Sequence, residues 1–194
     1  MKTVLINDKP VSVQLNPQDG SFLPCIETEL RKVSNLSAMF SDTNAVNNLI
    51  HLGDRIIYEI RYYPFLTGKS DMALGTTIIY PGKVGDEYHM TKGHFHETDD
   101  QPEIYHCVQG VGILQMMTLE GEYVSASWIK DTITHIPPQY AHRVINTGST
   151  PLVFVASFHI AAGHLYHPIE TKGFKYIVIE KDGKPLEVLN PKWV

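Results

Sequence analysis

Three histidines and one glutamate stand out as side chains that could together bind a metal ion. His94 and His96 lie two residues apart, Glu103 follows them, and His142 lies far downstream. Residues two apart on a β-strand point to the same face, so the first two imidazoles would point the same way. Imidazole and carboxylate ligands suit Fe(II), Mn(II), Ni(II) or Zn(II), and four protein ligands leave coordination positions open for substrate oxygens. The spacing therefore predicts one divalent metal site, built from residues of three strands.

The segments that must position these ligands have the composition of β-strands. Residues 97–102 are polar and can turn the chain between the first two histidines and Glu103. Runs rich in β-branched and aromatic residues recur between turn signals, a pattern typical of an all-β sandwich or barrel. We expect strands at 56–62, 76–80, 104–108, 112–118, 122–128, 132–136, 144–146, 152–159 and 176–180. A metal site shared by three strands indicates a small barrel with polar residues turned inward.

The N-terminal part of the chain differs from this pattern. Residues 1–30 predict one or two strands that wrap the main body, because short alternating runs are separated by turn signals. Residues 31–50 carry apolar residues at three- and four-residue spacing, which indicates helical or irregular structure. Ser41-Asp42 is placed to cap a short helix. We expect a single domain over residues 1–194, with the barrel core at about 55–160.

Composition excludes several classes of protein. The 194 residues are enough for a real core, and 43% hydrophobic content is ordinary for a globular protein. A net charge of −5 without a dense Lys/Arg run argues against a nucleic-acid surface, and no apolar run approaches the ~20 residues that span a membrane. The N-terminus has too short an apolar core for a signal peptide. Cys25 and Cys107 are expected to be reduced, so we predict a cytoplasmic protein.

Two motifs resemble those of the cupin family. In the first, Gly93-His94-Phe95-His96 is followed by six residues, Glu103, six residues and Gly110. The second runs from Pro137 through His142 to Asn146. The chain departs from the second motif at two positions where glycine is usual, which are Asp131 and Gln139. These departures concern the turns and leave the ligand unchanged.

The chain resembles one branch of that family more closely, the cupin-type glucose-6-phosphate isomerases, described mostly in archaea. Four separated segments within about residues 30–180 carry the resemblance, namely Tyr80 to Gly85, Thr91 to His96, Pro137 to Arg143, and Ala162 to His164 with Tyr166. It implies an all-β cupin barrel (a double-stranded β-helix or jelly roll) with an N-terminal extension and a few short helices. It also implies a homodimer, in which the N-terminal strands could be exchanged.

The resemblance assigns roles to particular residues. It implies His94, His96, Glu103 and His142 as ligands of one metal ion per chain, with Fe(II) favoured over Mn(II), Ni(II) or Zn(II). Glu103 would also act as the base in aldose–ketose exchange, assisted by Tyr105 or His164. Hydrogen would move either as a proton through a cis-enediol or as a hydride. Contacts to the sugar phosphate fall on Tyr58, Thr77, Thr91, Gly93 and Tyr166.

Other readings of these residues stay open at this point. Lys92 is either the cation that faces the phosphate or a solvated surface lysine, and Glu97, Asp99 and Asp100 are nearby alternatives to Glu103. Thr77, Thr91, Tyr58, Tyr105 and His164 could be ordinary strand or core residues. The six remaining histidines are expected to be structural or on the surface; these are His51, His89, His106, His135, His159 and His167.

The predicted activity is the interconversion of glucose 6-phosphate and fructose 6-phosphate. Rival enzymes at the same ligands are an isomerase of another phosphosugar, such as mannose 6-phosphate, and a metal-dependent dioxygenase. A dioxygenase needs no side chains that bind a phosphate. Replacing Thr91 should therefore raise the KM for a phosphosugar in an isomerase, and an unchanged KM would contradict the phosphate assignment. The third alternative is a cupin that binds a sugar but catalyses no reaction. In such a protein, Glu103→Gln would leave ligand binding intact, and there would be no turnover to abolish. Neither nucleic acid nor membrane is expected as a partner.

Overall fold

The structure is a computed structural model and describes residues 10, 12–23, 27–64 and 72–193. Its largest sheet is antiparallel and has six strands in the order β11-β8-β13-β5-β4-β3. These strands are β3 (Glu27–Lys32), β4 (Ile56–Pro64), β5 (Met72–Ile79), β8 (Glu103–Gln109), β11 (Ile133–Ile136) and β13 (Leu152–His159). Most match the predicted strands within a few residues, because their β-branched and aromatic composition suits a pleated surface.

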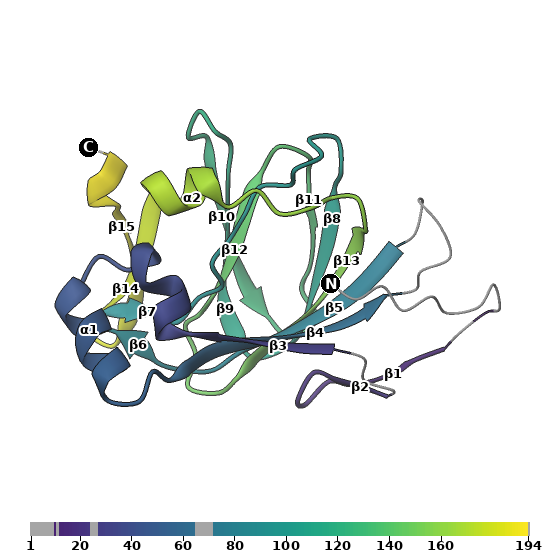
Figure 1. Cartoon of the computed structure of the whole chain (residues 1–194), viewed down its shortest axis with the longest axis horizontal. Helices are drawn as coiled ribbons and strands as arrows, with labels where there is room; N and C mark the ends of the chain where they lie inside the picture. Colours follow the sequence, from purple (N-terminus) through teal and green to yellow (C-terminus); the bar gives the residue numbers. More distant parts are fainter. Residues whose placement is uncertain (1–9, 11, 24–26, 65–71, 194) are drawn as a thin grey trace.

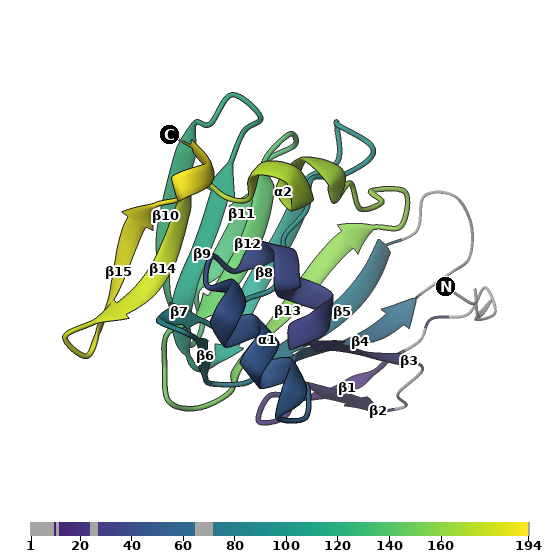
Figure 2. The same ribbon diagram turned by 60° about the vertical axis from the view of Figure 1, so that its left-hand side comes forward.

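A second antiparallel sheet of three strands faces the first (Figure 2). Its order is β10-β9-β12, with β9 at Val111–Met117, β10 at Tyr123–Ile129 and β12 at Ala141–Asn146. From β8 onward the chain passes back and forth between the two sheets, since β8, β11 and β13 belong to one and β9, β10 and β12 to the other. The predicted all-β cupin barrel is thereby confirmed.

Large apolar side chains fill the space between the two sheets. Trp128 of β10 is fully buried, and its ring centroid lies 5.6 Å from that of Phe154 on β13 and 6.0 Å from that of Tyr105 on β8. The indole Nε1 of Trp128 donates to Oγ1 of Thr134 at 3.0 Å, so its polar atom is satisfied. Tyr105 of this aromatic cluster contacts one of the predicted metal ligands, with 5.3 Å between its ring centroid and that of His142.

Short helices and a smaller sheet close one end of the molecule (Figure 1). The 3₁₀ helix η1 (Val33–Met39) precedes α1 (Thr43–His51), and Asp42 caps α1 by accepting from the amide of Ala45, as predicted. The smaller sheet has the order β15-β14-β7-β6. Its strands are β6 (Lys83–Val84), β7 (Glu87–Tyr88), β14 (Tyr176–Lys181) and β15 (Lys184–Leu189). Two further elements complete the description, α2 (His167–Lys172) and η2 (Pro191–Trp193).

The N-terminal strands form a hairpin on the large sheet. β1 (Gln14–Asn16) pairs with β2 (Ser21–Leu23), and Oγ1 of Thr76 on β5 donates to the carbonyl of Gly20 in their turn at 2.5 Å. That the N-terminal strands wrap the main body stays a prediction, and the part of it that falls on residues 1–9, 11 and 24–26 lies outside the described residues. Among the described residues, no helix has the length and apolar content needed to cross a bilayer.

One sequence expectation about the backbone is wrong. The segment that carries His94 and His96 is no regular strand but is held by isolated bridges, His94 to His142 and Phe95 to Leu165. Gly93 breaks the extended conformation just before it, with φ +77°. The two histidines therefore owe their position to bridges with neighbouring segments and not to strand alternation.

Candidate metal centre

The four side chains predicted as metal ligands lie together between the two larger sheets. One donor atom from each of His94, His96, Glu103 and His142 lies within 4.8 Å of the other three. Glu103 begins β8 in the six-stranded sheet, and His142 lies on β12 in the three-stranded sheet. The bridge between His94 and His142 attaches the 94–96 segment to β12. The four residues thus connect both sheets.

Backbone carbonyls determine which ring nitrogen faces the centre in two of the histidines. Nδ1 of His96 donates to the carbonyl of Gln101 at 2.7 Å, and Nδ1 of His142 donates to the carbonyl of Tyr140 at 3.1 Å. In a neutral imidazole the other nitrogen, Nε2, then carries a lone pair. Both Nε2 atoms lie near the same oxygen, Oε2 of Glu103, at 3.2 Å from His96 and 3.0 Å from His142.

A divalent cation fits this arrangement. Two lone pairs and an anionic oxygen repel one another unless a proton or a cation lies among them. Nε2 of His142 is buried and lacks a hydrogen-bond partner among the described residues, because its contact with Glu103 has the distance of an ion pair but not the geometry of a hydrogen bond. Leaving such an atom unsatisfied is costly, and coordination would satisfy it. Three imidazoles and a carboxylate without a thiolate match an open site better than a closed structural zinc site.

Local electrostatics favour the protonation states that a metal needs. Burial lowers the pKa of His94 well below its usual 6.5, and the neighbouring rings of His142, His164 and His96 lower it further. Burial alone would raise the pKa of Glu103, but His142 and His96 beside it outweigh burial, so the pKa falls below its usual value. Burial would lower the pKa of His96, but its contacts, first with Glu103, raise it. A neutral His94 and an ionised Glu103 are the forms that coordinate a cation.

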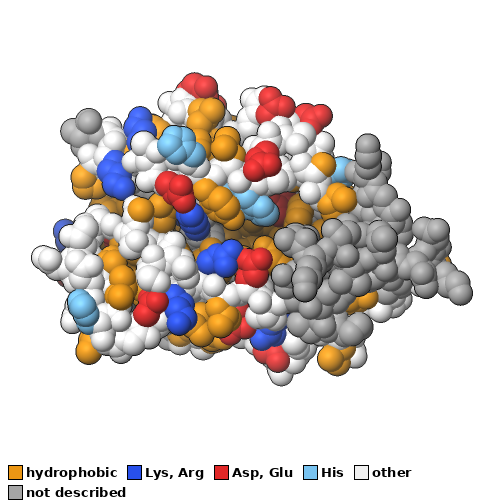
Figure 3. Space-filling model, viewed as in Figure 1, with side chains coloured by type: hydrophobic (Ala, Val, Ile, Leu, Met, Phe, Trp, Pro, Cys, Tyr) orange, Lys and Arg blue, Asp and Glu red, His pale blue; other side chains and the backbone are white. Residues whose placement is uncertain are grey.

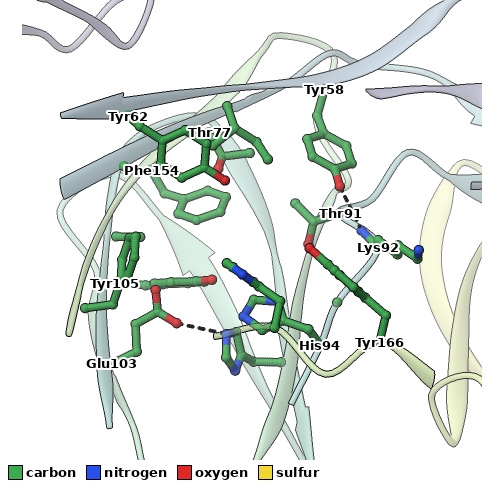
Figure 4. A pocket seen from close by; sticks show the side chains of 17 residues that line it. Tyr58, Tyr62, Thr77, Thr91, Lys92, His94, Glu103, Tyr105, Phe154 and Tyr166 are labelled. Carbon is green, nitrogen blue, oxygen red and sulfur yellow. Dashed lines mark hydrogen bonds and ion pairs between the residues drawn. The ribbon is translucent and has the colours of Figure 1, made fainter. Parts of the chain in front are cut away.

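The centre adjoins a pocket that opens to solvent. The space around it, open solvent included, is ≈ 570 Å³. All residues predicted to contact substrate line it, and the predicted catalytic residues do so as well (Figure 4). The first group is Tyr58, Thr77, Thr91, Gly93 and Tyr166, and the second is Glu103, Tyr105 and His164. The structure therefore brings every predicted site residue to one place.

Tyr105 and His164 contact different histidines of the cluster. The ring centroid of Tyr105 is 5.3 Å from that of His142, and the ring centroid of His164 is 4.4 Å from that of His94. Burial raises the pKa of Tyr105 well above 10, so its hydroxyl stays protonated and can donate a hydrogen bond. His164 lies at the mouth, where desolvation by the surrounding side chains lowers its pKa. The Tyr166 ring stacks on it at 5.8 Å.

The segment Thr91 to Gly93 shapes one wall of the pocket. Oγ1 of Thr91 accepts from the amide of Val144 at 3.0 Å, which fixes the side chain and leaves its hydroxyl hydrogen for a ligand. A Cβ on Gly93 would lie 2.5 Å from a ring atom of Phe174, so close packing and its positive φ both require glycine there. Because the chain turns at Gly93, Lys92 and His94 both line the pocket.

Several pocket residues were not predicted from the sequence. Tyr62 and Ile60 line the pocket beside Tyr58, and Phe154 and Phe158 of β13, in the same sheet, line it as well. The alternation of β4 contained the signal, because residues two and four positions from Tyr58 must share its face. None of the six histidines expected to be structural or on the surface lines this pocket in the described part of the chain.

Comparison with known proteins gives consistent results. The sequence model of the family described as Glucose-6-phosphate isomerase (GPI) matches residues 30–191. The glucose-6-phosphate isomerase of Thermococcus kodakarensis is 39% identical over 188 residues, which cover 95% of this chain and 97% of that protein. Those of Thermococcus litoralis and Pyrococcus furiosus are 37% and 36% identical, each with 95% of this chain and 97% of the relative covered.

One matching solved structure is distant in sequence. A mutant of the oxalate decarboxylase of Bacillus subtilis is 18% identical with a TM-score of 0.46. The match covers 58% of this chain and 28% of that chain. At this score it supports no conclusion about the present protein.

Proposed function

We propose that this protein interconverts glucose 6-phosphate and fructose 6-phosphate with the help of a divalent metal. The proposal starts from the family: the chain belongs to the glucose-6-phosphate isomerases, which are aldose–ketose isomerases. The observation that supports the metal is the convergence of His94, His96, Glu103 and His142 on one point. The orphan Nε2 of His142 is a further sign that an ion belongs there.

Glu103 is the proposed base. Its carboxylate is buried, lies beside the histidine cluster and lines the pocket, so it can reach a hydrogen on a bound sugar. A bound cation would supply Lewis-acid polarisation of the sugar's oxygens. Tyr105, with a protonated hydroxyl, and His164 at the mouth are placed to donate or accept a proton during ring opening. Transfer through a cis-enediol and direct hydride transfer both use this arrangement.

The opposite part of the pocket is proposed to hold the phosphate. Thr77 and Thr91 present hydroxyls, and Tyr58 and Tyr166 present phenols to the same space (Figure 4). Burial raises the pKa of Tyr58 to about 12, so this phenol is a hydrogen-bond donor at neutral pH. The backbone at Gly93 approaches the cavity closely because no side chain stands in the way.

Several finer properties belong to the same proposal. Fe(II) is the favoured metal, with Mn(II), Ni(II) and Zn(II) as alternatives, since the donor set suits all four. We also propose a cytoplasmic location, which the buried free thiol of Cys107 supports. The chain would act as one domain over residues 1–194 and as a homodimer, in which the N-terminal strands could be exchanged between protomers.

The test is isomerase turnover on metal-stripped protein. Fructose 6-phosphate is supplied before and after addition of Fe(II), Mn(II), Ni(II) or Zn(II), and formation of glucose 6-phosphate is measured. We expect no turnover without metal and restored turnover with at least one ion, which identifies the working metal.

Two variants sharpen this test. Glu103→Gln should lose turnover by at least about 100-fold, since it removes both a ligand and the base. His106→Gln is the matched control, because His106 is outside the pocket, and it should behave as wild type. Turnover of mannose 6-phosphate alone would redirect the proposal to another phosphosugar. Metal-dependent oxygen consumption without isomerisation would contradict it in favour of a dioxygenase.

A further inference from the structure

Lys92 is the one Lys or Arg side chain among the described residues that line the pocket. Its Nζ lies 2.5 Å from Oε1 of Glu170 on α2 and 4.4 Å from the centroid of the Tyr166 ring. The Lys92 side chain is 20% exposed, whereas that of Glu170 is 45% exposed. A largely enclosed cation at the pocket wall is therefore held by a carboxylate that remains in contact with water.

The phosphate group of a sugar phosphate is negatively charged, and the other pocket residues proposed to contact it carry no positive charge. The proposed contacts from Thr77, Thr91 and Tyr166 are neutral donors. Moving an anion out of water with neutral donors alone leaves most of its desolvation cost uncompensated, and a charge-assisted hydrogen bond reduces that cost. An ammonium on a flexible four-carbon stem has three donors and can change partner without moving the backbone.

A second basic side chain lies close by but is less well placed. Arg31 on β3 forms an ion pair with Glu29 at 2.6 Å and acts electrostatically on Tyr58 and Tyr166, yet it does not line the pocket. Basic and acidic side chains alternate around the recess near the centre of the face in Figure 3. Arg31 and Lys92 thus each have an acidic partner, and of these two side chains Lys92 is the one that lines the pocket.

We propose that Lys92 recognises the substrate's phosphate and that the phosphate displaces Glu170 from it on binding. This inference rests on the proposed function, because it assumes a phosphorylated sugar. Glu170 can return to water at little cost because it is already half exposed. A neutral sugar cannot displace the carboxylate, so the Lys92–Glu170 pair selects for phosphorylated substrates.

Two variants test the exchange by two readouts. In metal-loaded protein, calorimetry measures the Kd for inorganic phosphate, and turnover measures the KM and kcat for fructose 6-phosphate. Lys92→Gln should raise both Kd and KM by about 10-fold or more, the loss typical of a charged hydrogen bond, and change kcat by less than about 3-fold. Glu170→Gln should lower both Kd and KM, because it removes the competitor of phosphate. In the Lys92→Gln background, Glu170→Gln should have no effect.

Controls separate recognition from stability. Lys83 and Glu180 form a similar ion pair at 2.6 Å outside this pocket, so Lys83→Gln and Glu180→Gln should leave Kd and KM unchanged. Lys92→Arg keeps the charge and should retain most of the affinity. If Lys92→Gln misfolds, the Kd and KM of Glu170→Gln still test the exchange. The Glu170 side chain is half exposed, so its replacement should not disturb folding.

Two results would overturn the inference. One is an unchanged Kd and KM in folded Lys92→Gln. The other is weaker phosphate binding in Glu170→Gln, which would mean that Glu170 positions Lys92 and does not compete with the ligand. Wild-type protein without turnover on any metal would contradict the proposed function instead, and phosphate calorimetry, which needs no turnover, would still test the exchange.

Discussion

Gln139 and Asp131 occupy backbone positions that suit glycine. Both are turn residues where the cupin motif usually has glycine, and both have positive φ, +67° at Gln139 and +71° at Asp131. A side chain in this left-handed region is strained by roughly 1–2 kcal/mol, with Asp less affected than most residues. The chain therefore keeps the turn geometry of the motif without its glycines.

Replacing Gln139 by glycine should stabilise the protein. Relief of strain exceeds the entropy that glycine adds to the unfolded chain, so we expect the free energy of unfolding to rise by about 0.5–1 kcal/mol in a urea titration. Ser127 on β10 is exposed and its φ is not positive, so Ser127→Gly should destabilise instead. A Gln139→Gly variant as unstable as this control would show that the turn carries no strain.

Single residues at the site were predictable to different degrees. The clustering of His94, His96, Glu103 and His142 could be predicted, because their types and spacing restrict what they can do. Lys92 could not be resolved, because its direction depends on whether the chain stays extended, and the turn at Gly93 decides that. Tyr62 was missed although it shares a strand face with Tyr58.

At the scale of elements, the segment between β7 and β8 contains a buried histidine next to its bridge with β12. Nδ1 of His89 donates to the carbonyl of Tyr80 at 3.0 Å, while its buried Nε2 has no partner among the described residues. Burial is the largest cause that lowers its pKa below 6.5, and the charge of Arg55 acts in the same direction. Protonation of His89 is therefore disfavoured in the folded state.

This histidine should make the fold sensitive to acid. The unfolded chain binds a proton at His89 near pH 6.5, and the folded chain binds it only at lower pH, so stability is complete above about 6.5 and declines as the pH falls below it. Thermal unfolding between pH 8 and 5 should show a smaller loss in His89→Gln than in wild type. His135→Gln, at an exposed position, should follow wild type. Identical profiles for wild type and His89→Gln would contradict this account.

Most elements followed from composition, and the exceptions have physical reasons. The strands of both large sheets except β3 were predicted, because β-branched and aromatic runs favour them. Helix α2 has six residues, too few for a helical period to show. β15 contains Pro185, which argues against an inner strand, yet β15 is an edge strand, where proline is tolerated.

For the whole molecule, the four candidate metal ligands connect the two sheets. They come from β8, from β12 and from the bridged 94–96 segment. A ligand that binds only the folded state stabilises it by about 2.7 kcal/mol at 100 times its Kd. Unfolding separates these ligands, so an ion bound to all four must stabilise the native arrangement.

Metal addition should therefore raise the melting temperature of stripped protein. For a chain of this size we expect about 5–10 °C at 100-fold excess over Kd, measured by differential scanning calorimetry. His142→Ala should abolish the increase, and His106→Gln should keep it. An equal melting temperature with and without metal, in protein shown to bind it, would mean that the ion does not join the sheets.

The sheet order has a consequence for synthesis of the chain. β13 lies between β8 and β5 and pairs with both, although it follows them in sequence. On a ribosome, the edges of β5 and β8 must stay unpaired until residues 152–159 emerge. Open strand edges recruit other chains, so a nascent chain stalled before β13 is the form most prone to aggregate. Chaperone demand should accordingly peak in that interval of translation and fall once β13 has closed the sheet.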